Sequence, residues 1–293
     1  MSRGRRGFGG VLVAVVLAIA GPALAAPAMW KVTSPTATLY LFGTMHLLTD
    51  DASWRTPAFD AAYAEAKDVW FETDMNAAND PSVAQGLILQ YGLDPDHPLS
   101  GKLDAKHLAA LKATLAPMKL PFAGVNRMQP WAAALLVMAK PMTVAGFDPK
   151  AGADMTLTAS ALADHKTIRT FETLDQQIQL FSSMGEPAQV QMLDDTVADA
   201  GKTGAETKAM QAAWLSGDIQ RLGVLSLAEM QKDYPAFYEA LIAHRNAAWA
   251  NALTQELAGH DTELVNVGAL HMVGDAGLPA LLKARGFEVT RVQ

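Results

Sequence analysis

The segment Glu263-Leu-Val-Asn-Val-Gly-Ala-Leu-His271 joins a short apolar run to a glycine and, three residues later, to a histidine. The segment Thr38-Leu-Tyr-Leu-Phe-Gly-Thr-Met-His46 has the same form near the other end of the chain. Apolar, β-branched and aromatic runs of this length predict strands. A glycine at a strand end permits a sharp turn or the close approach of a ligand. We therefore predict one site built from both ends of the chain.

A strand–helix–strand unit follows the first of these segments. Residues 36–42 predict a strand, residues 56–67 a helix that begins with a threonine cap and a proline, and residues 68–72 a second strand. The two strands of such a unit lie parallel. We expect them to be neighbours, so that Glu72 comes within reach of His46.

The rest of the chain predicts mostly helices. Helical periodicity marks residues 81–90, 104–116, 130–142, 153–164, 174–183, 187–200, 205–230 with a break at Gly217, 235–257 and 278–284. Strands are predicted at 143–147, 167–171, 264–267 and 287–292. No linker divides the chain. We predict an α/β fold in which a mixed or mostly parallel central sheet of about six strands is flanked by many helices. It forms a single domain over 26–293, with a helical insertion at about 80–233.

Two further strands share an ending. Val69-Trp-Phe-Glu-Thr73 resembles Arg169-Thr-Phe-Glu-Thr173, and each predicted strand ends in Phe-Glu-Thr. Along the chain the order is Gly-x-x-His, Phe-Glu-Thr, Phe-Glu-Thr, Gly-x-x-His. A tandem duplication would not give this order, whereas a pseudo-symmetric sheet with both halves facing one crevice would.

The first 25 residues have the three parts of a secretory signal peptide. Arg3, Arg5 and Arg6 precede an apolar stretch over 10–20, and Ala23-Leu24-Ala25 is a small-x-small cleavage site. The sequence does not decide between the general and the twin-arginine export routes. We predict that the mature protein is periplasmic or secreted.

Composition restricts the function further. Without the three leader arginines, 20 basic residues face 30 acidic ones, a net charge of −10. This acidity argues against nucleic-acid binding, and we expect no membrane span after removal of the leader. The chain has no cysteine, so a metal would be bound by His, Asp or Glu.

The two histidines are candidate metal ligands. Ligands of open α/β sheets bind at the carboxyl ends of the strands, where His46 and His271 are predicted to lie. Imidazoles together with the carboxylate of Glu72 suit a divalent metal such as Mn, Co or Zn. Glu72 is also a candidate general base. The alternative is that the histidines cap backbone groups and that Glu72 is a surface residue.

Three other charged residues are candidates for the same site. Glu172 occupies the place of Glu72 in the second Phe-Glu-Thr strand, and serves either in catalysis or at a helix N-terminus. Asp74 is a reserve ligand, since it would face the same side as Glu72. Arg245 lies on the apolar stripe of a helix, where it needs a partner or a ligand. It would clamp a carboxylate, stabilise an oxyanion, or extend its charge to solvent at the core edge.

Six segments together resemble the TraB/GumN family, which includes PrgY-like proteins and is related to the Tiki metalloproteases. They are Leu41-Phe-Gly-Thr-Met-His46, Phe71-Glu72, Gln129-Pro-Trp131, Phe171-Glu-Thr-Leu-Asp-Gln176, Arg245-Asn246 and Val267-Gly-Ala-Leu-His-Met-Val-Gly-Asp-Ala-Gly-Leu278. The resemblance implies an α/β core shared with erythromycin-esterase-like and ChaN-like proteins. It also implies metal-dependent cleavage of peptides, as in the Tiki branch, with His46, His271 and Glu72 as metal and catalytic residues. Arg245 and Glu172 match further family positions.

Three hypotheses follow. The first is an exported metal-dependent hydrolase, most simply a peptidase that acts on a peptide or other small-molecule substrate, with Glu72, Glu172 and Arg245 as catalytic residues. The second is a non-catalytic envelope protein that binds a peptide or glycan in the same crevice. The third is an envelope protein whose histidines are structural. The sequence does not set the oligomeric state.

Overall fold

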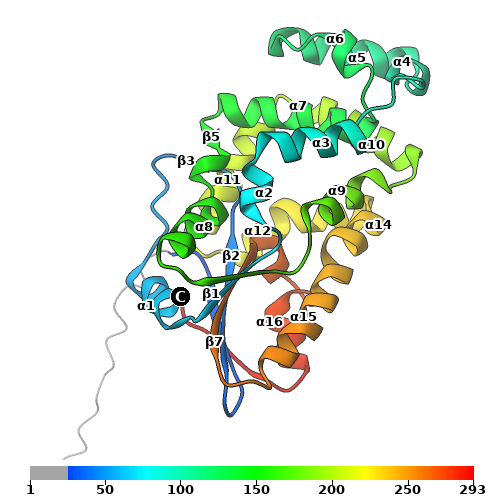
Figure 1. Ribbon diagram of the computed structural model, residues 1–293. Helices are drawn as coiled ribbons and strands as arrows, with labels where there is room; N and C mark the ends of the chain where they lie inside the picture. Colours follow the sequence, from blue (N-terminus) through cyan, green and yellow to red (C-terminus); the bar gives the residue numbers. More distant parts are fainter. Residues whose placement is uncertain (1–25) are drawn as a thin grey trace, which may run out of the picture.

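The computed structural model describes residues 26–293, so the predicted signal peptide lies outside the described residues. Among residues 26–293, no helix is both long enough and apolar enough to cross a membrane. The described chain forms a sheet with helices on both faces and a further group of helices beyond one end of the sheet (Figure 1).

The central sheet has six strands in the order β6-β4-β7-β2-β1-β8. Their bounds are β1 Met29–Thr33, β2 Thr38–Thr44, β4 Asp68–Phe71, β6 Thr167–Thr170, β7 Thr262–Gly268 and β8 Glu288–Arg291. Strands β6, β4, β7 and β2 pair parallel, whereas β1 is antiparallel to both of its neighbours. A separate pair, β3 (Leu48–Thr49) and β5 (Phe147–Asp148), is antiparallel. The predicted α/β class with a mostly parallel sheet is confirmed.

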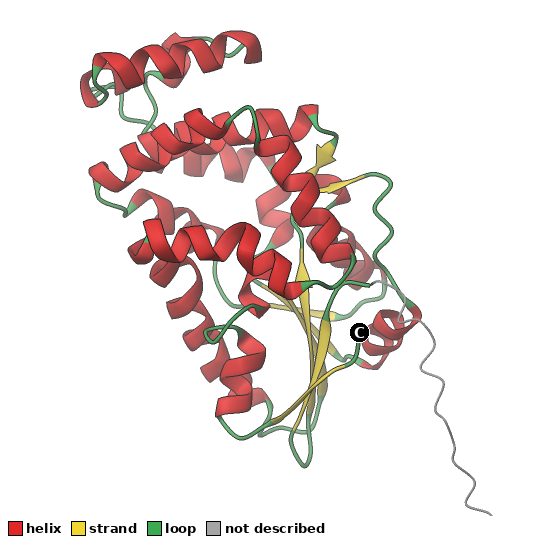
Figure 2. Cartoon of the chain, turned by 180° about the vertical axis from the view of Figure 1, so that it is seen from behind, coloured by secondary structure: helices red, strands yellow, loops and turns green. Residues whose placement is uncertain are grey.

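Each face of the sheet contacts its own helices (Figure 2). Alternation along β2 directs Tyr40 and Phe42 to one face and Leu39 and Leu41 to the other. The first face packs against α1 (Pro57–Glu65), α8 (Ala153–Ala163) and α11 (Thr203–Leu215). The second packs against α15 (His244–Glu256) and α16 (Leu278–Ala284). The sheet is therefore buried on both sides, as a parallel sheet requires.

A second apolar core lies away from the sheet. It is formed by α4 (Leu99–Lys102), α5 (Ala105–Met118), α6 (Phe122–Val125), α7 (Pro130–Val144) and α10 (Glu186–Asp199). In Figure 1 these helices lie above the strands, with α5 and α6 farthest from them. The remaining helical segments are α2 Met75–Asn79, α3 Pro81–Tyr91, η1 Pro149–Ala151, α9 Leu174–Ser182, α12 Ile219–Leu222, η2 Gly223–Leu227, α13 Ala228–Asp233, α14 Pro235–Tyr238, η3 Glu239–Ala243 and η4 Ala269–Met272.

Two of the sequence-based expectations are wrong. Strands β2 and β4 run parallel but are not neighbours, because β7 pairs between them. The helix expected to end at Lys140-Pro141 continues to Val144, and the strand expected over 143–147 is reduced to the two residues of β5. Packing of α7 against α10 and α11 maintains the helix beyond the proline, although proline removes one helical hydrogen bond.

Candidate functional site

The four motif-bearing strands lie side by side in the sheet. The two strands that end in Phe-Glu-Thr, β6 and β4, are paired, and so are the two that end in Gly-x-x-His, β7 and β2. Pairing of β4 and β6 continues past the strand ends, since the Glu172 amide donates to the Glu72 carbonyl at 2.9 Å. The carboxyl ends of four parallel strands thus bring all four motifs to one edge of the sheet.

His46 is fixed through one ring nitrogen. Its Nδ1 lies 2.8 Å from Oδ2 of Asp154, and the Thr44 hydroxyl donates to Oδ1 of the same carboxylate at 2.6 Å. Asp154 is buried, while the His46 side chain is 56% exposed and therefore reachable from the cavity. The negative charge of Asp154, together with its hydrogen bond to the ring, raises the pKa of His46 to about 9. Its other nitrogen, Nε2, lies 4.0 Å from Oε1 of Glu72.

Gly152 brings the two partners of this pair together. It precedes α8, whose first amide, of Ala153, donates to the carbonyl of Met45 at 2.9 Å. A β-carbon on Gly152 would overlap the carbonyl group of His46. The backbone at His46 and the start of α8 can approach this closely because the residue between them has no side chain.

His271 is fixed in the same manner by an amide. Its Nδ1 lies 2.6 Å from Oδ1 of Asn246, and the Asn246 Nδ2 group donates to the carbonyls of His271 and Ala276. Because an amide oxygen only accepts, Nδ1 of His271 carries the proton and Nε2 has the lone pair. The ring is buried beside Trp249, at 4.6 Å between centroids, and burial lowers the pKa of His271 to about 3.

Glu72 lies between the histidines. Its Oε1 accepts the Gly268 amide at 2.6 Å and is 3.7 Å from Nε2 of His271. A β-carbon on Gly268 would be 3.0 Å from this oxygen, so the close approach favours glycine. Burial alone would raise the pKa of Glu72, but His271, Arg245 and His46 with the Gly268 amide outweigh it and lower the pKa to about 2. Glu72 is therefore an anion at every physiological pH.

Arg245 has all five of its N–H donors in use. Its Nε and Nη2 donate to the carboxylate of Glu172 at 2.9 Å each, and Nη2 also donates to Oε2 of Glu72 at 2.6 Å. Its Nη1 donates to the Leu241 carbonyl at 3.0 Å and lies 3.1 Å from Nε2 of His271. Glu172 therefore binds Arg245, and Arg245 orients both Glu72 and His271.

A π-helical turn precedes Arg245 in the chain. The predicted helix over 235–257 is interrupted by η3, a π-helix over Glu239–Ala243, directly before Arg245. Such turns occur frequently at functional sites. The guanidinium also lies 4.5 Å from the ring centroid of Trp249, so it is held from one face as well as by its edges.

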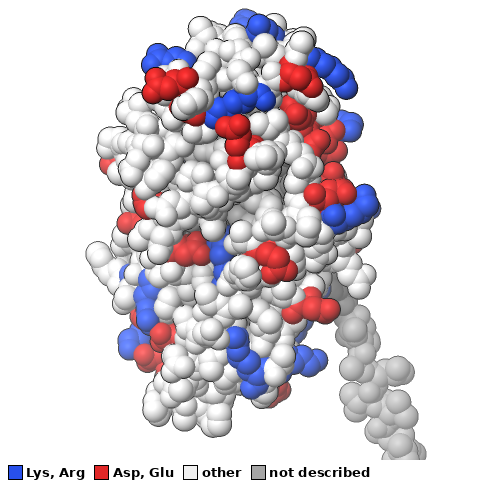
Figure 3. Space-filling view, turned by 90° about the vertical axis from the view of Figure 1, so that its right-hand side faces the viewer, with Lys and Arg blue, Asp and Glu red and all other residues white. Residues whose placement is uncertain are grey.

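His46, Glu72, Asp154, Arg245 and His271 line a cavity of about 560 Å³. The carboxyl end of the sheet supplies its polar floor, and α7, α9, α11 and η3 supply apolar walls. Figure 3 shows acidic and basic side chains interspersed over one face of the molecule, around a middle region that is mostly uncharged. The volume is within the range of small-molecule and peptide-side-chain pockets.

The donors at the floor suit a divalent cation in chemistry and orientation. Both histidines bind an oxygen through Nδ1 and direct Nε2 toward Glu72, which is the arrangement by which outer partners orient imidazole ligands. The carboxylates of Glu72, Asp154 and Glu172 with the guanidinium of Arg245 have a formal charge of −2, or −1 while His46 is protonated. Within residues 26–293, no three His, Asp or Glu side chains are already spaced as ligands of one ion.

The structure assigns Asp74 to a different role from the one expected. Its carboxylate accepts the amides of Asn76 and Ala77, which makes it the N-cap of α2 rather than a ligand at the cavity. The remaining five predicted site residues, His46, Glu72, Glu172, Arg245 and His271, lie within one connected network.

Sequence reasoning missed Asp154 and the role of Asn246. A signal for Asp154 exists, since it is the one acid in Ala153–Ala163, a helix otherwise made of apolar, small and hydroxyl side chains. Its position in the first turn has an ordinary explanation in the helix dipole, which conceals its contact with His46.

The fold and the floor of the cavity define an α/β protein with a strand-end pocket lined by two histidines, a glutamate, an aspartate and an arginine. The model of the TraB/PrgY/gumN family matches residues 28–291, and the chain belongs to this family.

Curated relatives include the uncharacterized protein YbaP of Escherichia coli K12 and that of Shigella flexneri. Each is 26% identical over 153 residues, which is 52% of this chain and 56% of the relative. The chain thus spans about half the length of the curated relatives it matches. No solved structure matches.

Proposed function

We propose that the protein is an exported metal-dependent hydrolase, and most simply a peptidase, whose reaction takes place at the floor of the cavity. The observation that carries this proposal is the orientation of the two histidines. Each has its Nδ1 bound to an oxygen acceptor and its Nε2 on the side of Glu72. Structural histidines would not need both Nε2 atoms to face the same carboxylate.

His46, His271 and Glu72 would hold the metal. When bound, a divalent metal such as Mn, Co or Zn lowers the pKa of a water molecule and polarises the scissile carbonyl. The net negative charge at the floor, which is −2 once His46 has lost its proton, favours such an ion. Entry of the cation requires Nε2 of His46 to be deprotonated, and Nε2 of His271 to exchange its contact with Arg245 for one with the ion.

The protein's own groups would position these ligands. The Gly268 amide and the Gln177 side chain hold the two oxygens of Glu72 in place. Glu172 holds Arg245, and Arg245 in turn neutralises part of the charge on Glu72. With its donors already in use, Arg245 is a positioning residue in this proposal rather than an oxyanion donor. Glu172 likewise acts through Arg245.

Turnover tests the proposal. Purified protein without its leader is incubated with a peptide library in the presence of Mn, Co or Zn, and cleavage is followed by mass spectrometry. We expect cleavage by the wild type and a loss of at least about 1000-fold in His46→Asn, because asparagine keeps a donor for Asp154 but lacks Nε2. No cleavage by the wild type with any of the metals, or full activity of the variant, would contradict the proposal.

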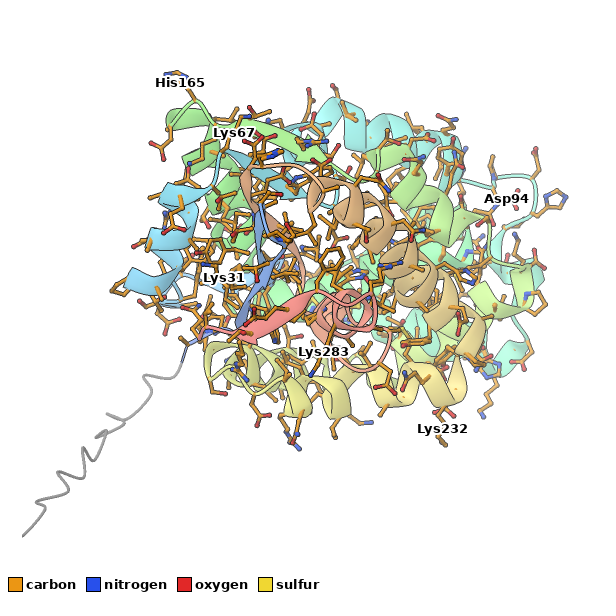
Figure 4. The ribbon with its side chains drawn as sticks, turned by 90° about the horizontal axis from the view of Figure 1, so that it is seen from below. Lys31, Lys67, Asp94, His165, Lys232 and Lys283 are labelled. Carbon is orange, nitrogen blue, oxygen red and sulfur yellow. The ribbon has the colours of Figure 1, made fainter. Side chains whose placement is uncertain are left out.

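A histidine far from the cavity provides the matched control. His165 projects outward at the edge of the molecule (Figure 4) and has a positive φ of 53°, which asparagine tolerates well. His165→Asn should cleave the same peptides at the wild-type rate. Loss of activity in both variants would show that the assay reports folding and not the site.

One observation favours the alternative function, a binding protein without turnover. The lone pair of His271 already accepts from Arg245, so His271, Arg245 and their carboxylate partners form a bonded network without a metal. A peptide or glycan would then bind above it without any chemistry. This alternative predicts ligand binding that is unchanged by a chelator and by Glu72→Gln, whereas a hydrolase should lose turnover in both cases.

A further inference from the structure

The walls of the cavity differ sharply from its floor. Five methionines, Met45, Met75, Met138, Met142 and Met210, come from four separate segments and are all partly exposed within it. Leucine, isoleucine and phenylalanine side chains complete the same surface. The ionisable groups of the lining belong to the floor, at the strand ends and the starts of α8 and α15. The wall is therefore an apolar chamber above a charged base.

Methionine makes this chamber adaptable. Its unbranched thioether side chain has three rotatable bonds and fits irregular apolar shapes without a fixed geometry. Water against such walls finds few hydrogen-bond partners, so an apolar group that displaces it gains free energy. The composition of the chamber thus favours an apolar occupant whose shape is not strictly defined.

The same walls disfavour a polypeptide backbone within the chamber, so a peptide substrate would keep its scissile bond at the charged floor. Each residue of a bound peptide brings an N–H and a C=O group that need partners once buried. The wall hydroxyl of Thr207 already donates to the carbonyl of Thr203, and the Gln177 amide donates to Glu72 at the floor. A hydrocarbon chain has no polar groups to satisfy. The volume of about 560 Å³ holds on the order of fifteen to twenty groups of the size of a water molecule.

We propose that the chamber binds a linear hydrocarbon chain. The natural substrate is then an amphiphile with an acyl amide group. Its hydrocarbon chain lies among the methionines, and its amide lies at the floor. This inference names the substrate class of the proposed hydrolase and rests on that function for turnover. The binding of the chain itself does not depend on it.

Chain-length dependence of binding tests the inference without catalysis. A series of N-acyl-alaninamides with acyl chains of increasing length is titrated into metal-free His46→Asn protein, below the critical micelle concentration, and Kd is measured by calorimetry. Each added methylene should lower Kd by roughly three- to fourfold until the chamber is full, and Kd should then level off. A Kd independent of chain length would overturn the inference.

A matched pair of methionine substitutions locates the site. Met142→Gln places a polar group of similar size in the wall, and should weaken binding of the longest chain by about tenfold or more while leaving that of the shortest unchanged. Met118→Gln is the control, because Met118 is also half-buried near a helix end but packs in the second core. Equal effects of the two substitutions would contradict the assignment.

The outcomes separate this inference from the proposed function. Chain-length-dependent binding without hydrolysis of any acyl amide or peptide would retain the chamber as a binding site and reject the hydrolase. Hydrolysis of short peptides with no dependence on acyl chains would retain the hydrolase and reject the chamber. Should Met142→Gln fail to fold, Met138→Gln on the same helix replaces it, and the chain-length series on unaltered walls stands by itself.

Discussion

The two ends of the parallel strands each hold an arginine stacked on a tryptophan and surrounded by carboxylates. At the carboxyl end, Arg245 binds Glu72 and Glu172 through hydrogen bonds of 2.6 to 2.9 Å. At the amino end, Arg169 lies 4.0 Å from the ring centroid of Trp70 and donates to Glu256 at 2.9 Å.

The distances from the two arginines to their carboxylate partners differ, and so do the charges of those carboxylates. At the amino end, Asp68 and Glu263 are 3.7 and 3.6 Å from Arg169, too far for hydrogen bonds. Burial raises the pKa of Glu263 to about 7, while that of Glu72 is lowered to about 2. The same residue types therefore produce a fixed anion beside a cavity at one end and a group that accepts a proton at the other. Geometry, and not composition, distinguishes the candidate site.

Removal of the arginine at each end should give the largest difference in stability between the two ends. Arg245→Gln leaves two buried carboxylates without their cation and should destabilise the fold by about 3–5 kcal/mol. Arg169→Gln should cost roughly 1 kcal/mol or less, because Arg169 is 36% exposed and Glu263 can take up a proton. Urea unfolding of both variants at pH 7 measures the difference. Equal losses would show that the two ends are energetically alike.

Neutralising Glu72 should have the next largest effect on stability. Glu72→Gln removes the anion that pairs with Arg245 and should cost roughly 2–4 kcal/mol at pH 7. Because the pKa of Glu72 is lowered on folding, its contribution is present above the ordinary pKa of 4.5 and is lost as the pH falls toward 2. The variant should therefore approach the wild-type stability in acid. A constant difference between pH 7 and pH 3 would contradict this account.

The equivalent substitution at the amino end should change the free energy of unfolding in the opposite direction. The pKa of Glu263 is raised on folding from its ordinary value of 4.5. Its contribution to the free energy of unfolding is therefore present below pH 4.5 and is lost as the pH rises through about 7. Glu263→Gln keeps an acceptor for the Trp70 indole and should stabilise the protein by about 1–2 kcal/mol at pH 8. At pH 5 its effect should be near zero. A Glu288→Gln control on exposed β8 should show no such pH dependence.

Asp74→Ala should have the smallest effect. It removes the N-cap of α2, a five-residue helix, and should cost about 1 kcal/mol. Since Asp74 caps a helix and does not face the site, metal binding and turnover should equal those of the wild type. A lower metal affinity in Asp74→Ala would restore it as a ligand.

Local pattern predicted most of the elements and the edge of the sheet at which the site lies. Strand endings in Gly-x-x-His and Phe-Glu-Thr gave four residues, His46, His271, Glu72 and Glu172, that the fold brings together, because parallel strands end at one edge. The order of strands is not a local property. Insertion of β7 between β2 and β4 follows from packing over the whole sheet, and periodicity within 38–72 contains no information about it.

The partners that orient the site were harder to predict. Asp154 resembles an ordinary first-turn acid, and its contact with His46 depends on Gly152, which lets two backbones approach. The π-helical turn over Glu239–Ala243 interrupts an otherwise regular helical pattern shortly before Arg245. Each of these features is a contact between segments that are distant in sequence or a deviation from the helical repeat, and neither produces a periodic signal.

Metal binding measures the central claim most directly. Isothermal titration of the metal-free wild type with Mn, Co or Zn should show one site per chain for at least one of these ions. His46→Asn and His271→Asn should each weaken that site by about 100-fold or more, because each lacks one Nε2, while His165→Asn should bind as the wild type does. Absence of binding in the wild type, or equal affinity in all four proteins, would contradict a metal centre at the carboxyl end of the sheet.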